Sequence, residues 1–221
     1  MRSHWNLGSD PIPNLAEFLE EKGIKVLALP LIENVSGLVC KVHRHSGSDV
    51  PAIVLNKDHT GERQRFTLAH ELAHLLLDLS SGVDEEKTSN RFAGAFLMPA
   101  NILRAEVGKH RHSISLGELF QLKTIFGVSV AAITYRCKDL GIIDKALYQR
   151  LFEVFKEQGW RHPPYSEPLP VERVQPARFK RLCFRALAEN AVSEAKAAEL
   201  LGISVRQLNL EMDQPPFIQA A

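Results

Sequence analysis

The chain lacks the features that define several large protein classes. Its three cysteines, Cys40, Cys137 and Cys183, lie far apart and form no CxxC pair, which excludes a zinc ribbon and a dithiol redox motif. An odd number of separated thiols suits a reducing compartment better than a secreted protein. The formal net charge is +1 over 221 residues, so bulk charge predicts neither a nucleic acid nor a membrane partner.

Long apolar runs are also missing. The run over 26–32 is short and is flanked by Lys25 and Glu33, and the first residues lack the apolar core of a secretory signal. The apolar fraction of 45% and the charged fraction of 24% are those of an ordinary globular protein. We therefore expect a soluble, cytoplasmic protein.

The hydrophobic pattern predicts a small sheet followed by helices. Apolar and β-branched runs predict strands, and stripes at helical spacing predict helices. The expected strands are 24–29, 37–43 and 52–56, with a turn over 44–49. The expected helices are 13–23, 61–79, 84–98, 115–126, 130–140 and 145–157. Ser115 with Glu118 makes a capping box, and Ser129 is placed to cap the next helix. This order indicates an α+β fold in which a small antiparallel sheet packs on helices.

Proline marks the main division of the chain. Five prolines lie between residues 161 and 176, which is typical of an extended linker or a wrapping arm. We predict a catalytic-type domain over 1–160, this linker over 161–176, a helical module over 177–213 and a tail over 214–221.

The most informative motif is His70-Glu71-Leu72-Ala73-His74. On a helix, positions i and i+4 share a face, so both imidazoles can bind one ion. The intervening Glu71 lies about 100° round the helix, near enough to reach a metal-bound water. Zinc suits imidazole ligands and keeps a position open for water. Glu71 would then be the general base that passes the proton of water to the leaving amine.

Two incidental histidines are the simpler interpretation, but the surroundings oppose it. The helix is apolar almost all round, which is typical of a buried helix, and burying His70, Glu71 and His74 is costly unless they are paired or bind a metal. Candidates for a third ligand are Asp78, Asp84, Glu85, Glu86, His110 and His112. We favour Glu86 because Asn90, one turn further along, could hydrogen-bond a ligand histidine. Glu85 points about 100° away, so we expect it to matter little.

The motifs resemble those of the ImmA/IrrE metallopeptidases. The resemblance rests on RFTLAHELAHL at 65–75, EKTSNRFA at 86–93 and FLMP at 96–99. It implies a zincin-like fold, with Zn²⁺ held by His70, His74 and Glu86.

Further segments, among them FGVS at 126–129 and GWR at 159–161, resemble a longer subgroup of the family. Members of this subgroup often carry an N-terminal helix-turn-helix domain, which we expect this chain to lack. The resemblance implies cleavage of a DNA-binding repressor, or membership of a toxin–antitoxin-like operon. The expected partner is thus a helix-turn-helix regulator or another operon-encoded protein.

The C-terminal module has the pattern of a helix-turn-helix, with Gly202 at the turn and Ser204 as the cap of the second helix. An alternative is a helical hairpin that packs on another surface. Acidic residues outnumber basic ones from Ala186 to Asp213, so we do not expect DNA binding by this module alone.

The leading hypothesis is a zinc metallo-endopeptidase that cleaves a regulatory protein. The alternative is a metal-stabilised, non-catalytic module that binds a partner. His110, His112 and Tyr135 are open candidates for oxyanion stabilisation.

Overall fold

The structure is a computed structural model that describes residues 1–44, 47–78 and 82–213. It divides into two compact units, with the boundary between Gln175 and Pro176. The predicted tail, 214–221, and the middle of the predicted turn, 45–46, lie outside the described residues.

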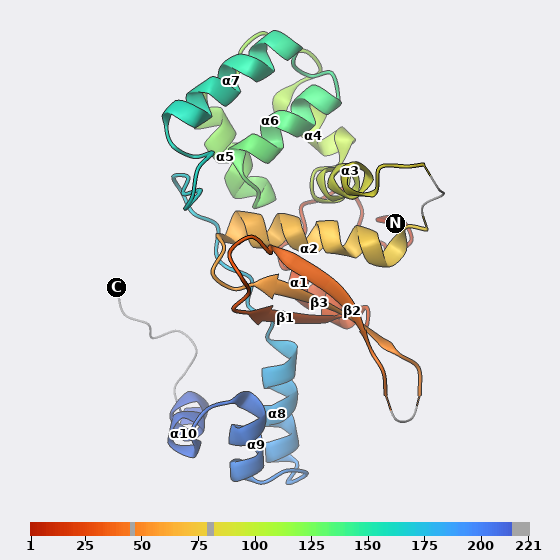
Figure 1. The fold of residues 1–221 in the computed structure, drawn as a ribbon, viewed down its shortest axis with the longest axis vertical. Coiled ribbons are helices and arrows are strands. Elements are labelled where there is room, and N and C mark those ends of the chain that lie inside the picture. Colours follow the sequence, from red (N-terminus) through yellow and green to blue (C-terminus); the bar gives the residue numbers. More distant parts are fainter. Residues whose placement is uncertain (45–46, 79–81, 214–221) are drawn as a thin grey trace. The chain divides into compact units, whose positions relative to one another are not determined.

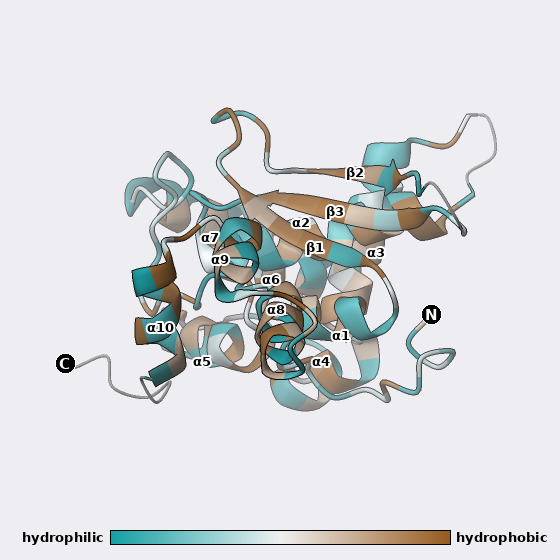
Figure 2. Ribbon diagram, turned by 90° about the horizontal axis from the view of Figure 1, so that it is seen from below, coloured by the Kyte–Doolittle hydropathy of each residue, from teal (hydrophilic) through white to brown (hydrophobic). Residues whose placement is uncertain are grey.

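The first unit contains a three-stranded sheet in the order β1-β3-β2. β1 spans Lys25–Leu29, β2 spans Gly37–Val42 and β3 spans Val50–Asn56. Because β3 lies between the other two strands, almost all of its residues are buried. This position explains the continuous apolar sequence of β3, visible as brown ribbon in Figure 2.

The α+β, zincin-like fold class is confirmed, but the sheet is mixed rather than antiparallel throughout. β2 and β3 form the expected antiparallel hairpin, with Leu38 opposite Val54. β1, however, runs parallel to β3, with Val26 beside Ile53. After β1 the chain crosses to the far edge of the sheet and returns through its centre, so β3 takes the direction of β1. Hydropathy shows which segments are strands, and it does not encode this order.

Helix α2, Gly61–Leu76, contacts β2, β3 and α3. Figure 1 shows it lying between the sheet and the later helices of this unit, from α3 to α7. Leu68, Ala69, Leu72 and Ala73 are fully buried along it, as the apolar pattern predicts. The remaining helices of the unit are α1 Leu15–Glu21, α3 Glu85–Leu97, α4 Ala100–Val107, α5 Leu116–Phe126, α6 Val130–Asp139 and α7 Lys145–Glu157.

The predicted helix caps are confirmed. Ser115 accepts a hydrogen bond from the Glu118 amide, and Ser129 accepts one from the Ala132 amide. Helix α4 was not predicted. Its N-cap is Pro99, a residue that ends one helix and, with its fixed φ, also favours the start of the next.

The proline-rich segment is tied to the first turns of α2 within the first unit. Glu62 Oε1 accepts from the Val171 amide at 3.1 Å, and Gln64 Oε1 accepts from the Val174 amide at 2.8 Å. A glycine is needed at the start of α2, because a Cβ on Gly61 would lie 2.2 Å from the Val171 carbonyl oxygen. The first unit therefore extends past the start of this segment, to Gln175.

A charged cluster is buried where the segment meets the helices. Lys123 is fully buried, and its Nζ lies 2.5 Å from Glu62 Oε1 and 3.1 Å from Glu167 Oε2. Glu167 Oε2 also accepts a hydrogen bond from the Val130 amide. Two carboxylates thus share one ammonium group in the interior.

The second unit consists of α8 Arg178–Ala188, α9 Glu194–Leu201 and α10 Val205–Asp213. Its small core contains Ala197, Ala198 and Leu208. The predicted turn and cap are both present: Gly202 is left-handed at φ +66°, and Ser204 accepts a hydrogen bond from the Gln207 amide.

Across the described part of the chain, no single helix is long and apolar enough to cross a membrane. The pair α5 and α6 meets the length and composition test only when taken together, across a bend of 95°.

Candidate metal centre

The structure brings the three predicted ligand residues together. His70 and His74 lie one turn apart on α2, and their Nε2 atoms are 3.1 Å apart. Glu86, in the first turn of α3, places Oε2 3.4 Å from His70 Nε2 and Oε1 3.6 Å from His74 Nε2. One ligand atom from each residue lies within 4.8 Å of the others.

The outer nitrogens of both imidazoles face oxygen acceptors. His70 Nδ1 lies 3.2 Å from Asn90 Oδ1, and the Asn90 amide nitrogen donates to the Glu86 carbonyl, which fixes the orientation of the amide. His74 Nδ1 lies 2.9 Å from Glu85 Oε1. In a neutral ring only one nitrogen carries hydrogen. With the hydrogen of each ring on Nδ1, the placement that these acceptors favour, both Nε2 atoms present lone pairs.

These lone pairs point into one space together with a carboxylate. Burial lowers the pKa of His70, and the nearby His74 adds to this effect, although Glu86 and Asn90 oppose it. The neutral ring is therefore the favoured form of His70. In this tautomer two imidazole lone pairs and a carboxylate converge on one space, which is the arrangement of donor atoms that a metal ion requires.

Glu71 lies beside the first residue of β2. It is buried, and a Cβ added at Gly37 would lie 3.2 Å from Glu71 Cγ and 2.6 Å from Thr67 Cγ2. Burial raises the pKa of the Glu71 carboxyl; His74 opposes this shift and the Glu86 carboxylate reinforces it. Glu71 is thus a stronger base than an exposed glutamate.

The other candidates for a third ligand take different positions. Asp84 caps α3 by accepting from the Lys87 amide, while Asp78, His110 and His112 are not among the residues of the metal-ligand group found in the described part of the chain. Glu85 contacts His74 directly, a contact that the spacing argument missed. The direction of α3 across α2, which brings both first-turn glutamates to the histidines, could not be read from sequence.

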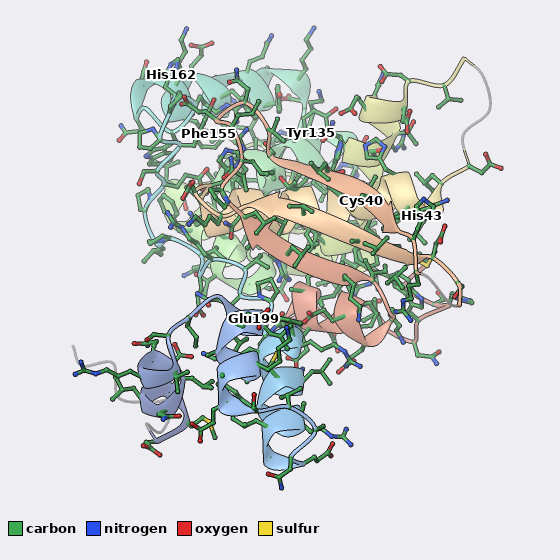
Figure 3. All side chains as sticks on the ribbon, turned by 60° about the horizontal axis from the view of Figure 1, so that its bottom comes forward. Cys40, His43, Tyr135, Phe155, His162 and Glu199 are labelled. Carbon is green, nitrogen blue, oxygen red and sulfur yellow. The ribbon has the colours of Figure 1, made fainter. Side chains whose placement is uncertain are left out.

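Tyr135 belongs to an aromatic cluster on α6 and α7. Its ring meets Tyr148 at 6.3 Å between centroids, and Lys138 Nζ lies over both rings. Figure 3 shows Tyr135 and Phe155 in the helical part of the unit, whereas Cys40 lies on β2. The structure offers no contact between Tyr135 and the candidate centre, so its role in oxyanion stabilisation stays a prediction.

An HExxH helix on an α+β fold, completed by a glutamate from the next helix, defines a metallopeptidase-type centre. The chain belongs to the M78 peptidase family, which is described as the IrrE N-terminal-like domain. The family model matches residues 19–138. This range includes the whole sheet, α2 and α3, and it confirms the family resemblance. None of the curated proteins matches the chain.

Proposed function

We propose that the protein is a zinc-dependent endopeptidase that cleaves a regulatory protein in the cytoplasm. The observation that carries the proposal is the convergence of His70 Nε2, His74 Nε2 and the Glu86 carboxylate beside the buried Glu71. Membership of a peptidase family supports the same reaction class.

Zinc fits the spacing of the donor atoms. Ligand atoms held about 2.0–2.1 Å from a tetrahedral ion lie about 3.3 Å from one another. The two Nε2 atoms here are 3.1 Å apart, and the two Glu86 oxygens lie 3.4 Å from His70 Nε2 and 3.6 Å from His74 Nε2. Two imidazoles with one carboxylate are also the ligand set of one class of catalytic zinc sites, in which the fourth position stays open.

Each side chain has a distinct task in this mechanism. Zinc, when bound, lowers the pKa of a coordinated water to about 7. The Glu71 carboxylate takes a proton from the attacking water and delivers it to the nitrogen of the scissile bond. The peptide bond then breaks with a neutral amine as the leaving group. Asn90 holds the His70 ring in the orientation that directs Nε2 inward.

The substrate class rests on the family resemblance. We propose a helix-turn-helix regulator or another product of the same operon as the protein that is cleaved. A non-catalytic module that binds such a partner would use the same metal ligands. Only a substitution of Glu71, which is not a ligand, can therefore distinguish the peptidase from the non-catalytic module.

The test compares Glu71→Gln with His70→Ala in cells that also make the product of the adjacent gene. Glu71→Gln keeps the shape and the ligands but removes the proton acceptor, so we expect full metal content and a rate lower by about 10²–10⁴-fold, with the partner uncleaved. His70→Ala should lose metal and activity together. Glu106→Gln, at an exposed position on α4, is the charge-matched control. If Glu71→Gln keeps both zinc and full function, the protein is the non-catalytic module instead.

A further inference from the structure

The two ligand histidines have different outer partners. His70 Nδ1 faces the neutral amide oxygen of Asn90 at 3.2 Å, whereas His74 Nδ1 faces the carboxylate of Glu85 at the shorter distance of 2.9 Å. A hydrogen bond to an ionised acceptor is stronger than one to a neutral acceptor. Among the described residues, the environment of the site is therefore asymmetric, because the charged outer partner lies on His74 and the neutral one on His70.

The start of α3 explains how Glu85 reaches this position. Asp84 caps the helix through the Lys87 amide, which makes Glu85 and Glu86 its first two residues. Glu86 faces the Nε2 side of the His74 ring at 3.6 Å, and Glu85 faces the Nδ1 side at 2.9 Å. Two neighbouring carboxylates thus hold one imidazole from both of its nitrogens.

We propose that Glu85 is a positioning residue that fixes the tautomer and ring orientation of His74 and increases its basicity as a metal ligand. A carboxylate on the outer nitrogen of a ligating histidine does both, and the loss of such a partner typically weakens metal binding by about 10–100-fold. The inference rests on the metal binding proposed above and concerns a residue that is not itself a ligand.

Glu85 also has a purely structural role available. An acidic residue in the first turn of a helix stabilises that helix through its dipole, and Glu85 is largely exposed. Loss of this effect would lower thermal stability without changing how His74 holds an ion. The experiment must therefore include a measurement that responds to the ligand itself.

The test uses the full chain as Glu85→Gln, Glu85→Ala and the matched control Glu106→Gln. Zinc affinity is measured by competition with a chromophoric chelator, and the ligand environment is followed by the visible absorption of the Co²⁺-loaded protein. We expect Glu85→Ala to weaken zinc binding by about 10–100-fold and to shift the cobalt bands. Glu85→Gln should fall between Glu85→Ala and the unchanged protein, because its amide oxygen still accepts from Nδ1 but carries no charge. Glu106→Gln should match the unchanged protein.

The outcomes separate the two proposals. If the unchanged protein takes up no zinc, the proposed function fails, and this inference fails with it. If the unchanged protein binds zinc while both Glu85 variants stay within about twofold of it with the same cobalt spectrum, only the role of Glu85 is refuted. A lower melting temperature with unchanged affinity would assign Glu85 to the helix terminus alone, which also refutes the inference.

Discussion

Replacing Lys123 by alanine should destabilise the first unit severely. The side chain is 0% exposed, and it is the cation shared by Glu62 and Glu167, which are 6% and 5% exposed. Removing it leaves two uncompensated carboxylates in the interior, and breaking a buried pair in this way costs about 3–5 kcal/mol. For a unit of this size, such a loss lowers the melting temperature by about 10 °C.

The stability contributed by the two buried carboxylates depends on pH. Burial raises the pKa of the Glu62 carboxyl, but Lys123 and two backbone amides outweigh it, so the net pKa is lowered. Burial also raises the pKa of Glu167, and there the Val130 amide and Lys123 offset only part of the rise. Glu62 therefore contributes stability that is lost as the pH falls through its lowered pKa. The stability that Glu167 contributes in its protonated form is fully present at low pH, and it is lost as the pH rises through the raised pKa of Glu167.

Without Lys123, neither carboxylate keeps a paired cation among the residues that the structure describes. Both should then favour the protonated form in the folded state, so the deficit of Lys123→Ala is smallest near pH 4 and grows towards pH 7, above the usual glutamate pKa of about 4.3. Urea unfolding followed by tryptophan fluorescence measures this, because Trp5 and Trp160 both lie in the first unit. A deficit below about 1 kcal/mol, or one that does not change with pH, would refute the reasoning.

Three further predictions concern the neighbourhood of the site. Ser89→Ala should raise the free energy of unfolding by about 1 kcal/mol, since no described residue hydrogen-bonds the buried Ser89 hydroxyl; urea titration checks this. Gly37→Ala should lower both stability and peptidase rate, because its Cβ would meet Thr67 and the Glu71 stem, and a normal rate would contradict it. Chelation should lower the melting temperature of the unchanged protein, while a His70→Ala, His74→Ala double variant, already without metal, should not respond.

The sequence was most informative where function depends on local spacing. The i, i+4 relation of His70 and His74 is a property of any helix, and the apolar surroundings predicted that this helix would be buried, as it is for Leu68 and Leu72. Helix caps are equally local, which is why those at Ser115 and Ser129 could be predicted. Glu86 required one further step, the spacing to Asn90 along the next helix.

Features that depend on tertiary arrangement could not be predicted. The contact of Glu85 with His74 depends on the angle at which α3 crosses α2. This crossing angle cannot be derived from the spacing of residues along one helix. The cluster of Glu62, Lys123 and Glu167 joins three segments far apart in the chain, and each residue alone resembles a solvated surface charge. The parallel pairing of β1 depends on strand order in the same way.

The C-terminal unit shows that a correctly predicted local pattern does not by itself define a function. The Gly202 turn and the Ser204 cap are present as expected, yet any compact three-helix unit could use them. Three of its basic residues pair with its own carboxylates: Lys180 with Glu211 at 2.6 Å, Arg185 with Glu189 at 2.8 Å and Lys196 with Glu199 at 2.7 Å. The phosphates of DNA would have to compete with these pairs. Phosphate binding depends on free lysine and arginine side chains that neutralise the DNA and release its condensed counterions. These pairs leave fewer cations for phosphate contacts, so they point the same way as the excess of acidic residues on which the expectation of no DNA binding by this unit alone rests.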